Sequence, residues 1–311
     1  MKTPMSPTLR VRGVCAIISA VIAVAALPAG AKGPIEVDLG SPHPVLPVMR
    51  VFGDDPQDQL GQFYSWSPIA IGDINGDGLA DIIVGAPNAG GALGIPSLGE
   101  TYVIYGGPNL PRSTVNLNTD GGITPAKETR IVCDPVSVGI EGHSELIRTL
   151  GSTVAAGDLD GDGTSDLIFS AEFASPRAEP EARFWGGTIH VLYGHATLPG
   201  CLLKIDPDAG KPQFGETRIF GHENYKRLGF LAMTVCDFDG DGFDDLVSQN
   251  SYGWVYILYG GKELRRGEIV DLNAKPPPHG GLSFLGSTHS RTMCHTPWPQ
   301  ETWMETDTTI S

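Results

Sequence analysis

Three short acidic segments of the sequence combine oxygen donors with glycines at matched spacing. Each follows the pattern Asp-x-Asp/Asn-x-Asp-Gly-x-x-Asp, and the segments begin at Asp73, Asp158 and Asp237. Alternate carboxylates in a loop direct several oxygens toward one point, and glycine permits the sharp backbone turn that wraps the chain around it. This arrangement is typical of a site for a hard divalent cation such as Ca²⁺, which prefers several oxygen ligands.

The expected ligands occupy matched positions in every loop. Side-chain oxygens come from the first, third, fifth and ninth positions, and a backbone carbonyl comes from the seventh, which is Leu79, Thr164 or Phe243. We therefore expect about three Ca²⁺ sites. The predicted sets are Asp73, Asn75, Asp77, Leu79 and Asp81; Asp158, Asp160, Asp162, Thr164 and Asp166; and Asp237, Asp239, Asp241, Phe243 and Asp245.

Other metals and another loop type fit these segments less well. Zinc is disfavoured because the loops contain no Cys or His, and magnesium usually keeps more of its water. An EF-hand requires Glu at loop position 12 and a helix on each side, whereas that position holds Val84, Phe169 or Ser248 in β-rich sequence. A solvated acidic turn is the alternative for any single loop, but three copies with the same glycines favour a metal site.

The elements around the loops repeat as well. Each loop separates two apolar strand-like segments, and a β-branched and aromatic segment ending in glycine follows at 101–107, 188–194 and 254–261. A further element, Glu-Thr-Arg-Ile, occurs at 128–131 and 216–219. One unit therefore reads strand, acidic loop, strand, turn, strand, loop, strand. Four short antiparallel strands per unit predict a β-propeller blade, with a β-sandwich carrying chance acidic turns as the alternative.

These motifs resemble FG-GAP repeats, the blades of the integrin α-subunit propeller and its relatives. Residues 85–87 read Gly-Ala-Pro, and Leu-Gly pairs at 60–61, 150–151 and 228–229 stand where Phe-Gly would be. The resemblance covers roughly residues 55–290. It implies an all-β propeller fold, calcium held structurally in loops on the lower face, and partners that bind mainly on the opposite face.

Two units depart from the family pattern. Ser170-Ala171-Glu172 and the segment 248–250 replace Gly-Ala-Pro in the second and third units. These changes put the turn after the strand in doubt, but they leave the expected ligands intact.

The first 31 residues are predicted to be a signal peptide. Positive residues precede the apolar run Val14–Leu27, and Ala29-Gly30-Ala31 is a small-residue cleavage motif, so we place the cut after Ala31. We therefore expect a secreted or cell-surface protein whose mature part does not insert into a membrane. A membrane anchor is the alternative interpretation of the apolar run.

The predicted blades occupy residues 32–290, at about 55–145, 146–224 and 225–285. The loops are widely spaced for blades, so we expect insertions at Asn109–Thr124 and Ser175–Arg183. Three units cannot close a propeller, so we expect an incomplete one of about three full blades and a disrupted fourth.

The tail 291–311 has no strand pattern. Back-translated with chosen codons and read one nucleotide earlier, it gives a fourth acidic loop. We interpret the tail as frame-shifted, with the frame lost between about Gly286 and His295. A natural tail is the alternative.

Charge and cysteine content restrict the function further. A net charge of −15 argues against nucleic acid and anionic membranes as partners. Cys133 and Cys201 flank turn-rich segments and could pair in an oxidising compartment, whereas Cys236 is expected to be a buried thiol in a core strand.

No catalytic motif emerges from the sequence. It contains neither G-x-S-x-G nor H-E-x-x-H, and it has no phosphate loop, so we expect no enzymatic activity. The favoured interpretation is an extracellular calcium-binding scaffold for ligand binding or cell adhesion, with an extracellular protein or glycan as partner. The alternatives are the accessory propeller of a secreted enzyme of the GPI-specific phospholipase D type, whose catalytic domain lies outside this chain, and a structural envelope component.

Overall fold

The computed structural model describes most of the repeat region. The described residues are 10–11, 36–37, 49–53, 56–62, 68–90, 97–107, 114–117, 128–134, 147–178, 182–262, 264, 266–273 and 282–285. Their only helix is the short 3-10 helix η1 (Pro56–Asp58), so none of them forms a helix long and apolar enough to cross a membrane. The predicted tail, the cleavage motif and nearly all of the predicted signal peptide lie outside the described residues.

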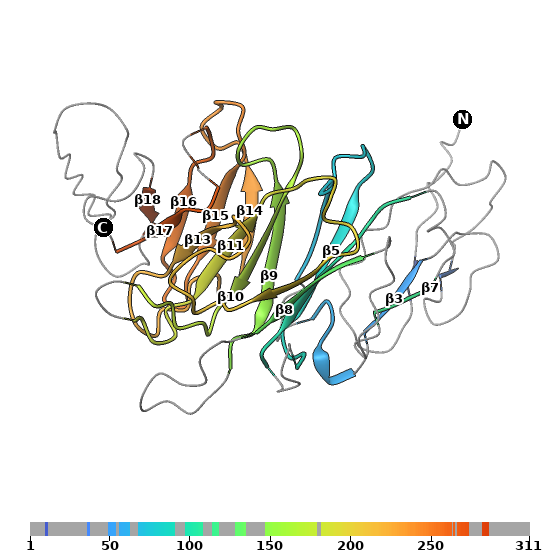
Figure 1. Cartoon of the computed structure of the whole chain (residues 1–311), viewed down its shortest axis with the longest axis horizontal. Coiled ribbons are helices and arrows are strands. Elements are labelled where there is room, and N and C mark those ends of the chain that lie inside the picture. The colour runs from blue at the N-terminus through green and yellow to red at the C-terminus, as the bar shows by residue number, and fades with distance from the viewer. Residues whose placement is uncertain are drawn as a thin grey trace, which may run out of the picture.

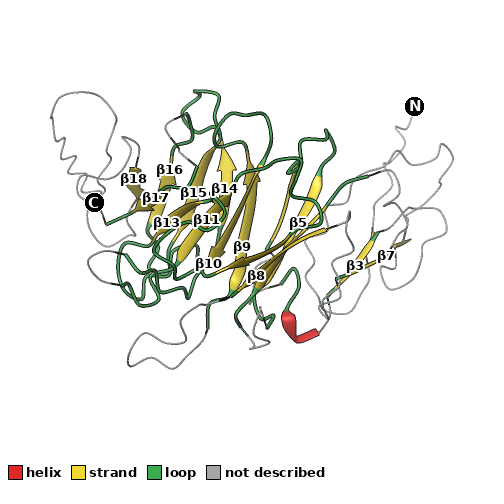
Figure 2. Cartoon of the chain, in the orientation of Figure 1, coloured by secondary structure: helices red, strands yellow, loops and turns green. Residues whose placement is uncertain are grey.

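Three sheets stand side by side in chain order (Figure 1), and loops occupy both ends of their strands (Figure 2). Each sheet contains four antiparallel strands that lie next to one another in chain order, and the acidic loop connects the first strand to the second. The predicted all-β class is confirmed, and the strand order within each sheet is the one expected for a propeller blade. The strands are β4 (Ile69–Gly72), β5 (Asp81–Ala86), β6 (Glu100–Ile104) and β8 (Glu128–Cys133) in the first sheet; β9 (Leu150–Gly157), β10 (Asp166–Ala171), β11 (Thr188–Leu192) and β13 (Thr217–Phe220) in the second; and β14 (Met233–Cys236), β15 (Asp245–Gln249), β16 (Val255–Leu258) and β18 (Leu282–Leu285) in the third.

Each unit also contains one short strand that pairs with a strand outside its own sheet. β12 (Leu202–Ile205) pairs in parallel with β8 of the first sheet, and β17 (Ile269–Asp271) pairs in parallel with β13 of the second. β7 (Thr114–Asn116) forms the same kind of pair with β3 (Arg50–Phe52). Within the predicted insertion at Asn109–Thr124, residues 114–116 form β7, which has a counterpart in each of the other two units, and the insertion itself stays a prediction. A two-residue parallel pair, β1 (Arg10–Val11) with β2 (Glu36–Val37), stands apart from these sheets.

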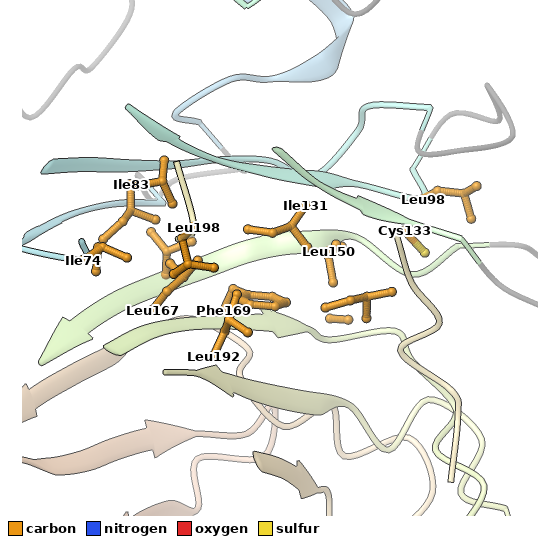
Figure 3. Packing of buried hydrophobic residues seen from close by; sticks show 14 of the residues in the cluster. Ile74, Ile83, Leu98, Ile131, Cys133, Leu150, Leu167, Phe169, Leu192 and Leu198 are labelled. Atoms are coloured by element: carbon orange, nitrogen blue, oxygen red, sulfur yellow. The ribbon is translucent and has the colours of Figure 1, made fainter. Parts of the chain in front are cut away.

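Two apolar cores lie between neighbouring sheets. In the first, Ile74 of the first loop packs with Leu167 and Phe169 of the second sheet (Figure 3). In the second, Leu159 of the second loop packs with Leu246 of the third sheet. The second residue of an acidic loop thus anchors its sheet to the following one. Phe238 holds this position in the third loop and is 59% exposed.

The three cysteines in the described region are free thiols. Cys133 pairs with Ile205 in the β8–β12 register, so Cys201 lies four residues away along the strand, about 13 Å at ~3.3 Å per residue. A disulfide needs Cα atoms within about 7 Å, so the Cys133–Cys201 bridge that we considered does not form.

The expectation of a buried Cys236 is wrong, because its side chain is exposed. Cys236 takes the place of Gly72 and Gly157 in the other sheets. Those glycines are covered by the next sheet: a Cβ at Gly157 would lie 2.2 Å from Cγ1 of Val235. The corresponding face of the third sheet is open at Cys236.

The turn after the second strand forms in all three units, despite the departures from Gly-Ala-Pro. A backbone N–H donates across the turn from Ala89 to Ala86 at 3.1 Å and from Ala174 to Ala171 at 3.0 Å. In the third unit, Oδ1 of Asn250 accepts from the Trp254 N–H at 3.0 Å and also from the N–H of residue 252. The third unit also has the backbone bond across the turn, from the Gly253 N–H to the Asn250 carbonyl at 3.1 Å, so the turn forms without proline in both the second and the third units.

Candidate metal centres

The second and third acidic loops each bring three carboxylates together. One oxygen from each of Asp158, Asp160 and Asp166 lies within 4.8 Å of the others, and Asp237, Asp239 and Asp245 form the same triad. Oxygens that share one Ca²⁺ at about 2.3–2.6 Å can be up to about 5 Å apart, so both triads have the spacing of a single-ion site. These are the first, third and ninth positions of the predicted sets.

The first carboxylate of each loop fixes the loop backbone. Oδ2 of Asp158 accepts from the N–H of Gly163 at 2.8 Å, which closes the loop on itself. Gly163 has φ +88°, a conformation that a residue with a side chain rarely adopts, which explains the glycine after the third acid. The equivalent bonds are Gly78 to Asp73 at 2.8 Å and Gly242 to Asp237 at 3.1 Å.

The ninth carboxylate ties the loop to the end of the third strand. Oδ2 of Asp166 accepts from Leu159 N–H at 3.0 Å, and Oδ1 accepts from Gly194 N–H at 3.2 Å. A Cβ at Gly194 would lie 2.3 Å from the Ser165 carbonyl oxygen, so only glycine fits. The matching bonds are Ile74 and Gly106 to Asp81, both 2.8 Å, and Phe238 and Gly260 to Asp245, 2.7 and 2.8 Å.

Sequence reasoning missed the role of this glycine. The repeated Tyr-Gly at the end of each third strand was visible in the sequence, but we interpreted it only as a turn. The backbone N–H of this glycine donates a hydrogen bond to the buried ninth carboxylate. The sequence did not show this bond because the two residues, Gly194 and Asp166 in the second unit, are 28 residues apart.

The electrostatics of the buried carboxylate favour a bound cation. Asp166 is 0% exposed, and burial, together with the charges of the neighbouring Asp160 and Asp158, raises its pKa to about 7, although its two backbone hydrogen bonds oppose the shift. Burial also raises the pKa of Asp81 and of Asp245. Three carboxylates facing one another need a positive charge, and an oxygen-only donor set suits a hard cation better than zinc.

The fifth and seventh positions behave differently from the triads. Oδ1 of Asp162 accepts from the Thr164 N–H at 2.9 Å and Oδ2 accepts from Arg266, and Asp162 is not one of the three converging carboxylates, so its role as a ligand stays a prediction. The same 2.9 Å bond joins Asp77 to Leu79 and Asp241 to Phe243. The carbonyl ligands of Leu79, Thr164 and Phe243 stay predictions.

The first loop has the same framework with one carboxylate fewer. Its third position is Asn75, which supplies an amide oxygen in place of a carboxylate oxygen. Asp73 and Asp81 keep the same backbone partners as their counterparts. The first site therefore has less negative charge than the other two.

Neighbouring loops are joined by hydrogen bonds between their backbones. The carbonyl of Asp73 accepts from Ser165 N–H at 2.9 Å, and the carbonyl of Asp158 accepts from Asp244 N–H at 3.0 Å. Oδ2 of Asp244 in turn accepts from Asp158 N–H at 2.9 Å. The first residue of one loop is thus bonded to the eighth residue of the next.

A comparison with protein-family models matches the FG-GAP repeat at residues 66–104 and 150–192. The chain carries FG-GAP repeats. Both matched segments contain an acidic loop with the strands on either side of it, which is the unit described above. The third loop lies outside the matched residues, although its triad and backbone bonds follow the FG-GAP units closely.

The glycine of the Gly-Ala-Pro segment in one FG-GAP unit contacts the glycine of the Leu-Gly pair in the next unit. Gly85 of the first unit lies against Gly151 of the second so closely that a Cβ on Gly85 would be 1.9 Å from the Gly151 carbonyl oxygen. At the next junction Ser170 replaces the first glycine, and its hydroxyl lies 3.2 Å from the carbonyl oxygen of Gly229, to which it donates. The substitution is therefore accommodated by new hydrogen bonds.

Distant homologues of these FG-GAP repeats include integrin α subunits and a phospholipase. The chain is 25% identical to chicken (Gallus gallus) integrin alpha-V over 239 residues, covering 71% of this chain and 18% of that protein. It is 30% identical to mouse (Mus musculus) phosphatidylinositol-glycan-specific phospholipase D over 169 residues, covering 54% of this chain and 16% of the other. For Drosophila melanogaster integrin alpha-PS5 the identity is 26% over 192 residues, with 61% and 15% covered. The chain spans less than a fifth of the length of these curated relatives.

Proposed function

We propose that this chain is an extracellular, non-catalytic calcium-binding scaffold that presents its FG-GAP blades to a protein or glycan ligand. The observation that carries the proposal is the convergence of three carboxylates in each of two acidic loops, on a framework that all three loops share. Homology to integrin α subunits supports a scaffold role.

The ion would have a structural role, because its ligands belong to the loops that connect the strands of each sheet. Asp158, Asp160 and Asp166 would hold it in the second loop, and the corresponding triad would hold it in the third. A bound Ca²⁺ supplies positive charge that neutralises the clustered carboxylates. The buried ninth carboxylate connects the site to the end of the third strand, so occupancy should stabilise both the loop and its sheet.

Calcium is expected to raise the melting temperature of the chain. Binding to the folded state alone stabilises it by about 2.7 kcal/mol at a free Ca²⁺ concentration 100 times Kd, or roughly 4 to 5 °C for a chain of this size. Differential scanning calorimetry in EDTA and in Ca²⁺ measures the shift. Replacing both Asp158 and Asp160 by alanine should remove the contribution of the second loop.

The matched control for that experiment is Glu223→Ala, a half-exposed carboxylate away from the loops. It should keep the full calcium response. Identical melting curves in chelator and in calcium, or a full response in the Asp158→Ala/Asp160→Ala protein, would contradict the proposed sites.

The extracellular location rests on the predicted signal peptide. N-terminal sequencing of the protein recovered from the medium of expressing cells should begin at Lys32, directly after Ala31. Retention of Met1 in a cell-associated product would contradict both the cleavage site and the location.

A second candidate is the accessory propeller of a secreted enzyme, and the match to phosphatidylinositol-glycan-specific phospholipase D supports it. In that case the chain itself would still lack catalysis. Incubating the purified chain with a GPI-anchored protein tests this point: release of the anchored protein by this chain alone would contradict the non-catalytic role.

A further inference from the structure

The second acidic loop is bonded to an arginine from the following unit. Arg266 lies in the turn between β16 and β17, and its Nη2 donates to Oδ2 of Asp160 at 2.9 Å and to Oδ2 of Asp162 at 2.7 Å. Its Nε lies 3.1 Å from the same Asp160 oxygen. One guanidinium therefore bonds two of the carboxylates predicted to bind the ion, and Asp160 belongs to the converging triad.

An aromatic ring helps to hold this guanidinium. The central carbon of Arg266 lies 4.7 Å from the centre of the Tyr193 ring, close enough for a cation–π contact. Tyr193 immediately precedes Gly194, whose N–H donates to the third carboxylate of the triad, Asp166. Two carboxylates and the Tyr193 ring therefore position Arg266, and Tyr193 lies at the end of the strand whose following glycine bonds Asp166.

The other two loops differ from the second in this respect. Within the described part of the chain, no Lys or Arg is ion-paired with a carboxylate of the third loop. The second unit has a turn equivalent to the one that carries Arg266, and this turn corresponds to the first loop. The two turns are matched by the buried residues Leu198 and Leu264, whose N–H groups each donate to the carbonyl three residues earlier. Two residues beyond Leu198 the chain has Gly200, where the third unit has Arg266.

We propose that Arg266 is a tethered counter-cation that competes with the divalent ion for the second loop. This inference rests on the proposed calcium function. Ca²⁺ and the guanidinium need the same Asp160 carboxylate, and their charges repel at this distance. Ca²⁺ therefore binds the second loop more weakly than the charge of its carboxylates alone would dictate.

The competition works in both directions. If Arg266 weakens Ca²⁺ binding by a given factor, Ca²⁺ weakens the Arg266 contact by the same factor. Filling the second loop therefore loosens the turn that carries Arg266 and leads into β17, the strand paired with β13. Without the ion, Arg266 neutralises part of the carboxylate charge and keeps the loop in place.

The test is the calcium affinity of an Arg266→Gln variant, measured by isothermal titration calorimetry on the full chain. Because the Arg266 side chain is 47% exposed, solvent screens the pair, and we expect binding to tighten about fivefold at the second loop. In EDTA the same variant should melt at a lower temperature than the wild type, because it loses the guanidinium contacts.

Two comparisons separate a local effect from a general change in charge. Lys262→Gln removes an exposed positive charge from the same turn and should leave the affinity unchanged. Asp158→Asn disables the second loop, and adding Arg266→Gln to that background should have no further effect. Arg266→Lys keeps the charge but loses the planar fork, so it should show an intermediate affinity.

Each outcome decides between the hypotheses. Unchanged affinity in Arg266→Gln, with binding that Asp158→Asn still reduces, overturns the competition and leaves the calcium function intact. An equal gain in Lys262→Gln also overturns it, because general charge would then explain the effect. Absence of calcium binding in every protein overturns both the competition and the proposed function.

Discussion

Replacing Gly85 with alanine is expected to destabilise the chain by about 3 kcal/mol or more. The added Cβ would lie 1.9 Å from the carbonyl oxygen of Gly151 and 2.9 Å from its carbonyl carbon. Both atoms belong to backbone, so no flexible side chain can move aside. Relief requires the first and second sheets to separate at the position where the two FG-GAP glycines meet.

Urea denaturation at constant calcium concentration measures this effect as a lower midpoint, with Gly107→Ala as the control. Gly107 has open space around the place of a Cβ, so its substitution should change stability by less than about 0.5 kcal/mol. If Gly85→Ala and Gly107→Ala unfold at the same urea concentration, the close contact between the first two units does not exist in solution.

Replacing Glu172 with glutamine is expected to stabilise the chain at alkaline pH by roughly 3 kcal/mol. Glu172 is 0% exposed, and among the described residues neither of its carboxylate oxygens has a hydrogen-bond partner. Burial raises its pKa from 4.5 to about 7, against the opposing influence of the Arg227 charge. The folded state therefore binds the proton more tightly than the unfolded state does.

The sign of the pH dependence follows from this pKa. The contribution of Glu172 is fully favourable below about pH 4.5 and is lost as the pH rises through about 7, where the buried carboxyl must ionise. Glutamine has the same shape and does not titrate. The stability difference between the two proteins should be small at pH 5 and approach its full value above pH 8.

Thermal melts of both proteins from pH 5 to pH 9 measure this difference. Other buried groups such as His190 titrate equally in both proteins, so the difference between the proteins is more informative than either curve. Glu223→Gln, at a half-exposed position, should follow the wild type at every pH. A constant difference between Glu172→Gln and the wild type across this range would contradict a raised pKa at Glu172.

The repeated local patterns of the sequence predicted the fold class and the core of the candidate sites. Alternating acids with glycines specify a loop whose first, third and ninth residues converge, as Asp158, Asp160 and Asp166 do. The apolar runs on each side specify the strands that hold the loop. Both patterns, the spaced acids and the apolar runs, could be recognised because each involves residues close together in the sequence. The fifth residue, Asp162, is not one of the three converging carboxylates and bonds Arg266, a contact that the spacing of acids does not encode.

Features that depend on contacts between units could not be predicted in the same way. β7, β12 and β17 are strands of three or four residues that pair with another unit, so no local pattern marks them. Arg266 reaches Asp160 across 106 residues of sequence. Cys236 was expected to be buried because its strand is apolar, but burial depends on whether another sheet covers that face.

The bonds between the first residue of one loop and the eighth of the next have a mechanical consequence. Asp73 is bonded to Ser165, and Asp158 to Asp244, so a force that pulls one sheet from its neighbour acts directly on the candidate ion sites. An ion that stiffens a loop would then raise the force at which adjacent sheets part. In this arrangement the acidic loops would bear load between sheets, and the concentration of free calcium would set the tensile strength of the chain.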